Sequence, residues 1–155
     1  MARVFVDVNV FSDEWFSAVL GELIKSKNVQ FVFGTSVLFQ KEQGRVRKAL
    51  ELYKILGQMK ASNGQRKRID ADADELERHQ GIISAQQCFI GSSDCDDPHI
   101  FALIYVKPTR FIFSNDARLA SCRDYINQYV DSRYCDFIII SAAATYNAHK
   151  HAIHH

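Results

Sequence analysis

Four acidic residues at separate points of the chain could together hold divalent metal ions. They are Asp7, Glu42, Asp97 and Asp116. Carboxylate oxygens are the ligands that Mg²⁺ and similar hard cations prefer, and Mg²⁺ keeps positions for water and substrate phosphate. Two such ions about 3.5–4 Å apart can activate water and stabilise the leaving oxygen of a phosphodiester. These residue types therefore predict phosphodiester hydrolysis, provided that the fold brings the four side chains together.

Each acid also has a plain structural explanation, and the explanation for Asp7 is the weakest. Asp97 and Asp116 each precede a predicted helix and could cap it, and Glu42 could be a solvated helix residue. Asp7 stands between two valines in an apolar segment, where a carboxylate without a partner is costly. We therefore expect a functional role first for Asp7. Asp96, beside Asp97, is an alternative metal ligand.

The elements that must position these acids are short apolar strands that alternate with helices. Strands are predicted at residues 3–8, 29–33, 110–114 and 136–141. Helices are predicted between Ser12 and Asn28 and at residues 36–44, 46–59, 70–87 with an interruption near Gly81, 97–106, 116–125 and 142–150. Such alternation predicts an α/β fold with a central, mainly parallel sheet of four to five strands covered on both faces. Ligands of such sheets bind at the carboxyl ends of the strands, where we expect the four acids to converge.

The chain length and the ends of the sequence predict one domain. A chain of 155 residues suits a single domain, which we expect to span residues 1–148. Residues 149–155 contain four histidines and are expected to be a disordered tail or a remnant added for protein expression. The apolar run at the N-terminus is too short for a signal peptide, and no apolar stretch approaches 18 residues. These features predict a cytoplasmic protein without a membrane span.

The four cysteines show no spacing typical of a zinc site. Cys88, Cys95, Cys122 and Cys135 form no C-x-x-C pair. We expect them to be buried, reduced thiols of a cytosolic protein.

Charge is distributed unevenly along the chain. Residues 40–68 carry nine basic and two acidic side chains, whereas residues 70–97 carry eight acids and Arg78 as the only arginine or lysine. A basic segment beside an acidic centre suits a phosphate polymer as ligand, and the alternative is a solvated helix face without a ligand. Residues 61–65 are predicted to form a turn, which could be the tip of a helical hairpin that presents residues 66–68. The candidates for phosphate contacts are Arg45, Arg47, Lys48, Arg66, Lys67 and Arg68.

Four short motifs occur in a fixed order along residues 3–141. They are Asp7-Val8-Asn9 after an apolar strand, Glu42 shortly after Ser36, Asp97 before an apolar helix with small residues, and Ser114-Asn115-Asp116 after a further strand. This order resembles the PIN-domain family of nucleases, above all the small prokaryotic toxin-type members. The segment 58–80 is more charged than is typical of that family, and the chain after Ser141 carries no family motif.

The resemblance implies a fold, an activity and a set of roles. It implies a three-layer α/β/α fold and cleavage of single-stranded RNA that depends on Mg²⁺ or Mn²⁺. The four acids would hold the metal, and Asn9 and Ser114 would orient ligands or water from behind them. The family also includes toxins of toxin–antitoxin pairs, so a protein inhibitor and a homodimer are expected partners.

Two other functions stay open on the sequence alone. One is a non-catalytic PIN-like module that binds RNA or a protein, as family members that lack an acid do. The other is a DNA-directed nuclease of similar fold. All four acidic positions are filled here, which favours an RNA-cleaving enzyme.

Overall fold

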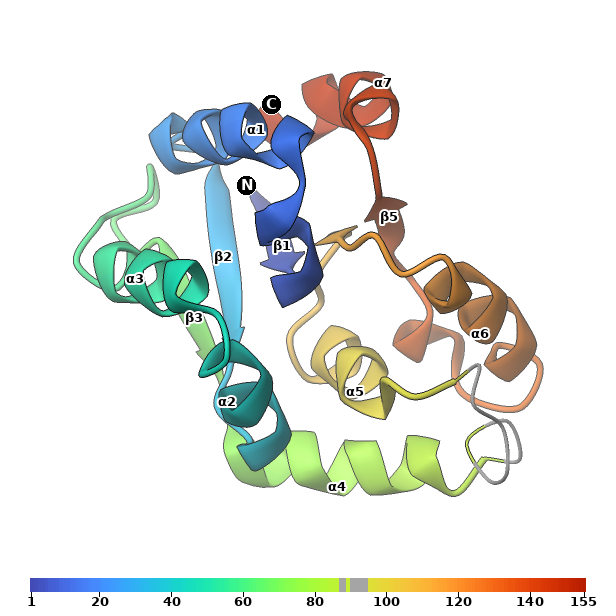
Figure 1. Cartoon of the computed structure of the whole chain (residues 1–155). Helices are drawn as coiled ribbons and strands as arrows, with labels where there is room; N and C mark the ends of the chain where they lie inside the picture. Colours follow the sequence, from blue (N-terminus) through green and yellow to red (C-terminus); the bar gives the residue numbers. More distant parts are fainter. Residues whose placement is uncertain (87–88, 90–94) are drawn as a thin grey trace.

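A computed structural model describes residues 1–86, 89 and 95–155, and its centre is a five-stranded sheet (Figure 1). All the strand pairs are parallel, in the order β3-β2-β1-β4-β5. The strands are β1 (Ala2–Val6), β2 (Val29–Gly34), β3 (Arg68–Ala71), β4 (Phe111–Phe113) and β5 (Ile138–Ile140).

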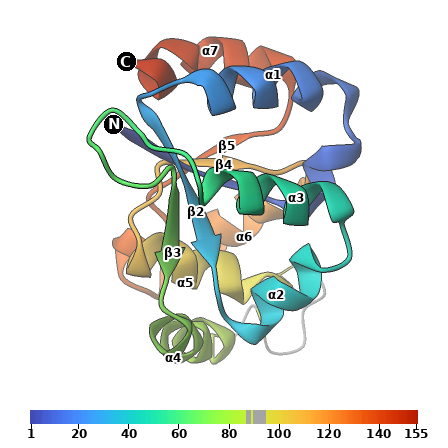
Figure 2. The ribbon, with the colours of Figure 1, turned by 90° about the vertical axis from the view of Figure 1, so that its left-hand side faces the viewer.

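Helices cover both faces of the sheet and give a three-layer α/β/α fold (Figure 2). One face is covered by α1 (Glu14–Lys25), α3 (Arg47–Leu56) and α7 (Ala143–His154). The other face is covered by α4 (Ala73–Ser84), α5 (Pro98–Val106) and α6 (Arg118–Ile126), and α2 (Val37–Gln43) adjoins this layer through Phe39. Two short 3₁₀ helices, η1 (Val8–Ser12) and η2 (Ser132–Tyr134), complete the described elements. The predicted α/β class, parallel sheet and layer arrangement are confirmed.

Alternation along β1 explains why its sequence is apolar almost throughout. Val4 and Val6 face the layer of α1, α3 and α7, whereas Phe5 faces the layer of α4, α5 and α6. Successive side chains of a strand point to opposite faces, so a strand buried on both faces needs apolar residues at every position.

The strand order changes direction beside β1, and the position outside the carboxyl ends of β1 and β4 corresponds to what is called the crevice of such sheets. From β1 the chain first builds outward through β2 to β3, then returns to place β4 on the other side of β1. Val6 pairs with Phe113 at the ends of β1 and β4, so the residues that follow both strands emerge together. In open α/β sheets this reversal point is where ligands bind.

The prediction for residues 70–87 is wrong at its start. Residues 68–71 form β3, which pairs with β2 from Phe31↔Arg68 to Gly34↔Ala71. Helix α4 begins only at Ala73, where the Asp72 carboxylate accepts a hydrogen bond from the Glu75 backbone N–H. The helix also continues without interruption through Gly81. A glycine costs only about 1 kcal/mol in a helix interior, which the burial of Leu76 and Ile83 offsets.

The predicted disorder of the histidine-rich end is also wrong. Helix α7 runs to His154, and Ile153 is fully buried against the core. The Asn28 side chain donates a hydrogen bond to the backbone oxygen of His154. The last turn of α7 is therefore part of the folded domain.

The cysteines differ from the sequence prediction as well. Cys95, just before α5, and Cys122, on α6, form a disulfide, so the expected pair of reduced thiols is wrong at these positions. Cys135 is buried as expected, whereas Cys88 lies outside the described residues. Within residues 1–86, 89 and 95–155, no helix has the length and apolar character needed to cross a membrane.

Candidate metal centre

Asp7 lies at the carboxyl end of β1, inside the crevice between β1 and β4. The sequence had predicted that Asp7 lies within a strand at residues 3–8. The strand instead stops at Val6 and η1 begins at Val8, so Asp7 follows the strand. Its side chain is largely buried, at 8% exposure. Burial raises the pKa of Asp7 above its usual range, although the hydrogen bond from Ser114 opposes the shift. The side chain is thus a desolvated carboxyl group at the position where open α/β sheets commonly bind ligands.

Asn9 and Ser114 hold the Asp7 carboxyl group, as their place in the motifs suggests. The Ser114 hydroxyl donates to Asp7 Oδ2 at 2.9 Å, and Asn9 Nδ2 lies 3.3 Å from the same oxygen. Asn115 adds a link that the sequence did not predict, because its backbone N–H donates to Asn9 Oδ1. These bonds fasten the ends of β1 and β4 to each other.

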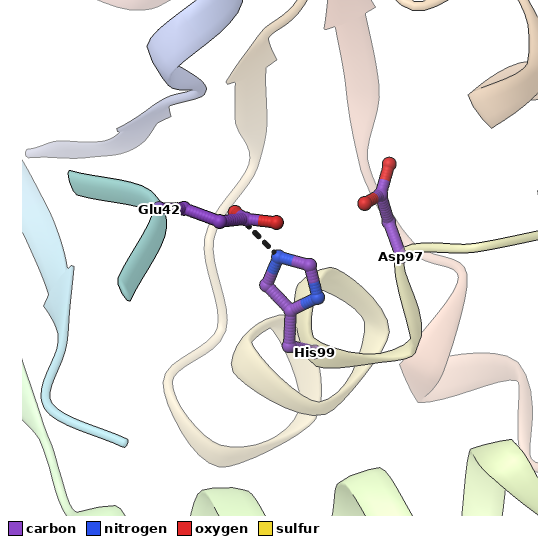
Figure 3. A group of neighbouring side chains, drawn as sticks. All are labelled: Glu42, Asp97 and His99. Carbon is purple, nitrogen blue, oxygen red and sulfur yellow. Dashed lines mark hydrogen bonds and ion pairs between the residues drawn. The ribbon is translucent and has the colours of Figure 1, made fainter. Parts of the chain in front are cut away.

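Glu42 reaches the same region from α2 and meets a histidine that sequence reasoning missed. His99 Nε2 lies 2.9 Å from Glu42 Oε2 (Figure 3). The His99 side chain is 1% exposed, on the first turn of α5. The available signal was a polar ring two residues after Asp97 in an otherwise apolar helix.

Asp97 lies between the other acids. The pKa of Asp97 is raised to about 7, mainly by burial and also by the negative charges of Asp7, Asp96 and Glu42, while His99 opposes the shift. Ligand atoms of Glu42, Asp97 and His99 lie within 4.8 Å of one another. Although Asp97 occupies the N-cap position of α5, its side chain accepts no capping hydrogen bond. The capping explanation therefore does not account for this residue.

Asp96 and Asp116 form the outer part of the cluster, together with Arg118. Ligand atoms of Asp96, Asp97 and Asp116 also lie within 4.8 Å of one another, so Asp97 belongs to both groups. Arg118 contacts Asp96 Oδ2 at 3.1 Å and Asp116 Oδ1 at 3.2 Å. Burial tends to raise the pKa of Asp116, but the hydrogen bonds from Arg118 outweigh it and leave the pKa below its usual value. The Arg118 backbone N–H also donates to Asp116 Oδ1, but the N-cap of α6 is Ala117, so Asp116 precedes the helix and is not its cap.

The inner acids have no comparable counter-charge. Among the described residues, no lysine or arginine forms an ion pair with Asp7, Glu42 or Asp97. Asp7 belongs to neither group of close ligand atoms, whereas Glu42, Asp97 and His99 form one group of two carboxylates and an imidazole, ligands that suit a divalent cation. The group could therefore hold a metal ion.

The predicted basic residues fall at two different places. Arg45 lies between α2 and α3, and Arg47 and Lys48 lie on the first turn of α3; all three are exposed, a few residues after Glu42. Arg66, Lys67 and Arg68 lie at the start of β3. Because all strands are parallel, that start is at the edge of the sheet opposite to the acids.

Residues 61–65 are not the tip of a helical hairpin, because the chain that follows them leads into strand β3. Lys67 is buried, and its amino group donates to the backbone oxygens of Ser26 and Val29. Burial lowers the pKa of Lys67 to about 8. Arg68 is half-buried and donates to the backbone oxygen of Tyr53. The prediction that Lys67 and Arg68 contact RNA is therefore corrected: both side chains bind backbone oxygens of neighbouring elements and support the packing of β3.

The chain was also compared with known proteins. Comparison of the chain with protein-family models, with curated proteins and with solved structures finds no match.

Proposed function

We propose that this protein is a divalent-metal-dependent endoribonuclease that hydrolyses phosphodiester bonds of single-stranded RNA. The observation that carries the proposal is the buried Asp7 carboxyl group, which faces the charges of Glu42 and Asp97 in the crevice between β1 and β4. Carboxylates this close raise each other's pKa unless a cation offsets their charge. A divalent ion is the simplest group that satisfies the site.

The residues proposed to hold Mg²⁺ or Mn²⁺ are the four acids of the motifs, with Asp96 as the alternative to Asp97. Asp97 is favoured because it belongs to both groups of ligand atoms, whereas Asp96 is exposed and paired with Arg118. When bound, such an ion lowers the pKa of a water molecule and offsets the charge that develops on the phosphate.

The protein's own side chains prepare this site in three ways. Ser114 and Asn9 both donate to Oδ2 of Asp7 and so fix the orientation of its carboxyl group. Arg118 pairs with Asp96 and Asp116 and offsets part of their negative charge. The exposed side chains of Arg45, Arg47 and Lys48 would hold RNA phosphates beside Glu42.

The choice of single-stranded RNA depends on the resemblance of the four motifs to PIN-domain nucleases. The same resemblance suggests a cytoplasmic toxin that a protein antitoxin inhibits, and a homodimer as the working unit. A non-catalytic RNA- or protein-binding module and a DNA-directed nuclease are the outcomes that the assay below separates from this proposal.

The test is cleavage of labelled single-stranded RNA and DNA with Mg²⁺ or Mn²⁺. We expect RNA to be cut by the wild type, and we expect Asp7→Asn or Asp116→Asn to lower the rate by at least about a hundredfold, the upper end of the effect of residues that only support ligands. Asp136→Asn is the matched control, because Asp136 is exposed at the start of β5, at the opposite edge of the sheet. Activity that survives both active-site substitutions contradicts the proposal, and cleavage of DNA alone supports the DNA-directed alternative.

A further inference from the structure

We infer that His99 is a positioning residue that holds the Glu42 carboxylate in the metal centre. This inference rests on the proposed function. It assigns to His99 a role that acts through Glu42 rather than on the metal or the RNA directly.

Glu42 needs a partner because its own helix does little to fix it. Helix α2 has seven residues, and the Glu42 side chain is 27% exposed. A glutamate side chain has several rotatable bonds, and ordering it costs conformational entropy. His99 belongs to α5, whose residues from His99 to Ile104 are all buried, so it offers a fixed point. The 2.9 Å contact therefore connects the Glu42 carboxylate, on a side chain with several rotatable bonds, to the buried helix α5.

The environment of the imidazole ring decides which nitrogen carries the proton. A carboxylate only accepts hydrogen bonds, so Nε2 must be the protonated nitrogen in this contact. His99 Nδ1 is buried and has no hydrogen-bond partner among the described residues. The opposite tautomer would place a bare Nε2 against the carboxylate and leave a buried N–H without an acceptor. The Nε2-protonated ring is thus the form that fits.

The same observation separates a positioning role from a ligand role. A histidine that ligates a metal donates its other ring N–H to a carboxylate, a carbonyl or water. Were Nε2 of His99 a ligand, Nδ1 would have to carry that proton, and no acceptor faces it in the described part of the chain. His99 is therefore better suited to donate to Glu42 than to bind the ion.

Phe39 fixes the ring from the side of α2. The Phe39 and His99 rings meet edge to face with centroids 4.7 Å apart. Phe39 and Glu42 are three residues apart on α2, so both lie on the face of that helix that meets α5. Gly34 makes room for this arrangement, because a Cβ at that position would lie 2.3 Å from the Phe39 ring. Helix α2 thus supplies both Phe39, which packs against the His99 ring, and Glu42, which that ring contacts.

Two substitutions of His99 test the inference. His99→Phe keeps an aromatic ring against Phe39 but removes the donor, whereas His99→Gln restores an N–H near the position of Nε2. We expect His99→Phe to fold and to bind Mn²⁺ about 10–100-fold more weakly than the wild type in calorimetric titrations. We expect His99→Gln to recover most of that loss. In RNA cleavage, kcat should fall with His99→Phe while KM changes little, because His99 does not contact the RNA.

The outcomes distinguish this inference from the proposed function. A wild type that binds no Mn²⁺ contradicts the proposed function itself. A wild type that binds Mn²⁺ with the same affinity as His99→Phe overturns the role of His99 alone. His99→Gln that binds as weakly as His99→Phe also overturns it, since that result indicates a metal ligand. His79→Gln is the matched control, because His79 lies on α4 and contacts Tyr134 rather than an acid.

A second measurement applies even if the variants fail to fold. The ¹⁵N spectrum of the imidazole groups in the metal-free wild type reports the tautomer of His99. We expect the Nε2-protonated form. An Nδ1-protonated His99 contradicts the donated hydrogen bond and with it the inference.

Discussion

The Ser114 hydroxyl donates a hydrogen bond to the Asp7 carboxyl group at 2.9 Å, across the two strands at which the sheet reverses its order. The two residues are 107 positions apart in the chain, and each follows the carboxyl end of its strand. Ser114 has no exposed surface. The hydroxyl therefore orients the acid on which the proposed activity depends most.

Replacing Ser114 with alanine should weaken metal binding without unfolding the protein. The substitution removes the side-chain hydrogen bond that lowers the pKa of Asp7, so the charged form of Asp7 becomes less favourable. We expect Mn²⁺ affinity to fall about tenfold, as is typical for a residue that supports a metal ligand. Ser141→Ala is the control, because Ser141 follows β5 as Ser114 follows β4 but is exposed. Equal affinities of the two variants would show that Ser114 plays no part in the site.

The metal-free protein should lose stability as the pH rises toward neutrality. Burial and neighbouring acids raise the pKa of Asp97 to about 7, whereas an aspartate in an unfolded chain titrates near about 3.9. The folded state then holds a proton that the unfolded state releases between these values, so the contribution of Asp97 to stability is present below about pH 4 and lost as the pH rises through about 7.

Urea denaturation with a chelator at several pH values measures this effect. Asp97→Asn carries no titrating group and should flatten the decline between pH 4 and 7. Added Mn²⁺ should raise the melting temperature of the wild type most at the upper end of the range, by mass action. If the stability of the wild type and that of Asp97→Asn change with pH in the same way over this interval, the raised pKa of Asp97 is contradicted.

Reducing the disulfide between Cys95 and Cys122 should destabilise the domain. The bond closes a loop of 27 residues, which corresponds to about 3–4 kcal/mol of lost chain entropy in the unfolded state. We expect dithiothreitol to shift the urea midpoint of the wild type downward. The double variant Cys95→Ser, Cys122→Ser should show the low midpoint with or without the reductant. No response of the wild type to dithiothreitol is the contrary result.

The exposed basic residues after Glu42 should account for the salt dependence of RNA binding. Arg45, Arg47 and Lys48 are candidates for three phosphate contacts, and each contact contributes about 0.7 to the slope of log K against log salt concentration for single strands. Replacing all three with alanine should lower the slope by about 2. Arg66→Ala serves as the control, since Arg66 is exposed at the opposite edge of the sheet. A slope that responds to Arg66 and not to the triple variant would reverse the proposed path of the RNA.

The pattern of apolar residues along the sequence predicts the strands that consist mainly of apolar side chains. The apolar runs around Val4, Phe31, Ile112 and Ile139 indicate four of the five strands. Strand β3 escapes prediction because its short segment contains Arg68 and the exposed Asp70 and reads as charged, unlike the apolar β5 at the other edge of the sheet. The order of the last turn of α7 depends on the burial of Ile153, a contact with the rest of the domain that helical pattern alone does not reveal.

The site divides in the same way between local and long-range information. Strand ends and their motifs indicate Asp7 and Asp116, because the carboxyl edge of a parallel sheet follows from the strands. The partner of Glu42 depends on how α2 packs against α5, so His99 is visible only in the folded protein. A count of charges likewise cannot show that Lys67 is buried. The spacing of the cysteines in the sequence cannot show that Cys95 and Cys122 approach to a Cα–Cα distance of 5.4 Å.

The most direct test of the central claim is RNA cleavage by metal-depleted protein to which Mn²⁺ is returned. The account predicts that wild-type protein cuts single-stranded RNA only after Mn²⁺ is added, and that Asp7→Asn, matched in fold by circular dichroism, does not. Cleavage by Asp7→Asn at the wild-type rate, or wild-type cleavage that persists in excess chelator, would contradict it.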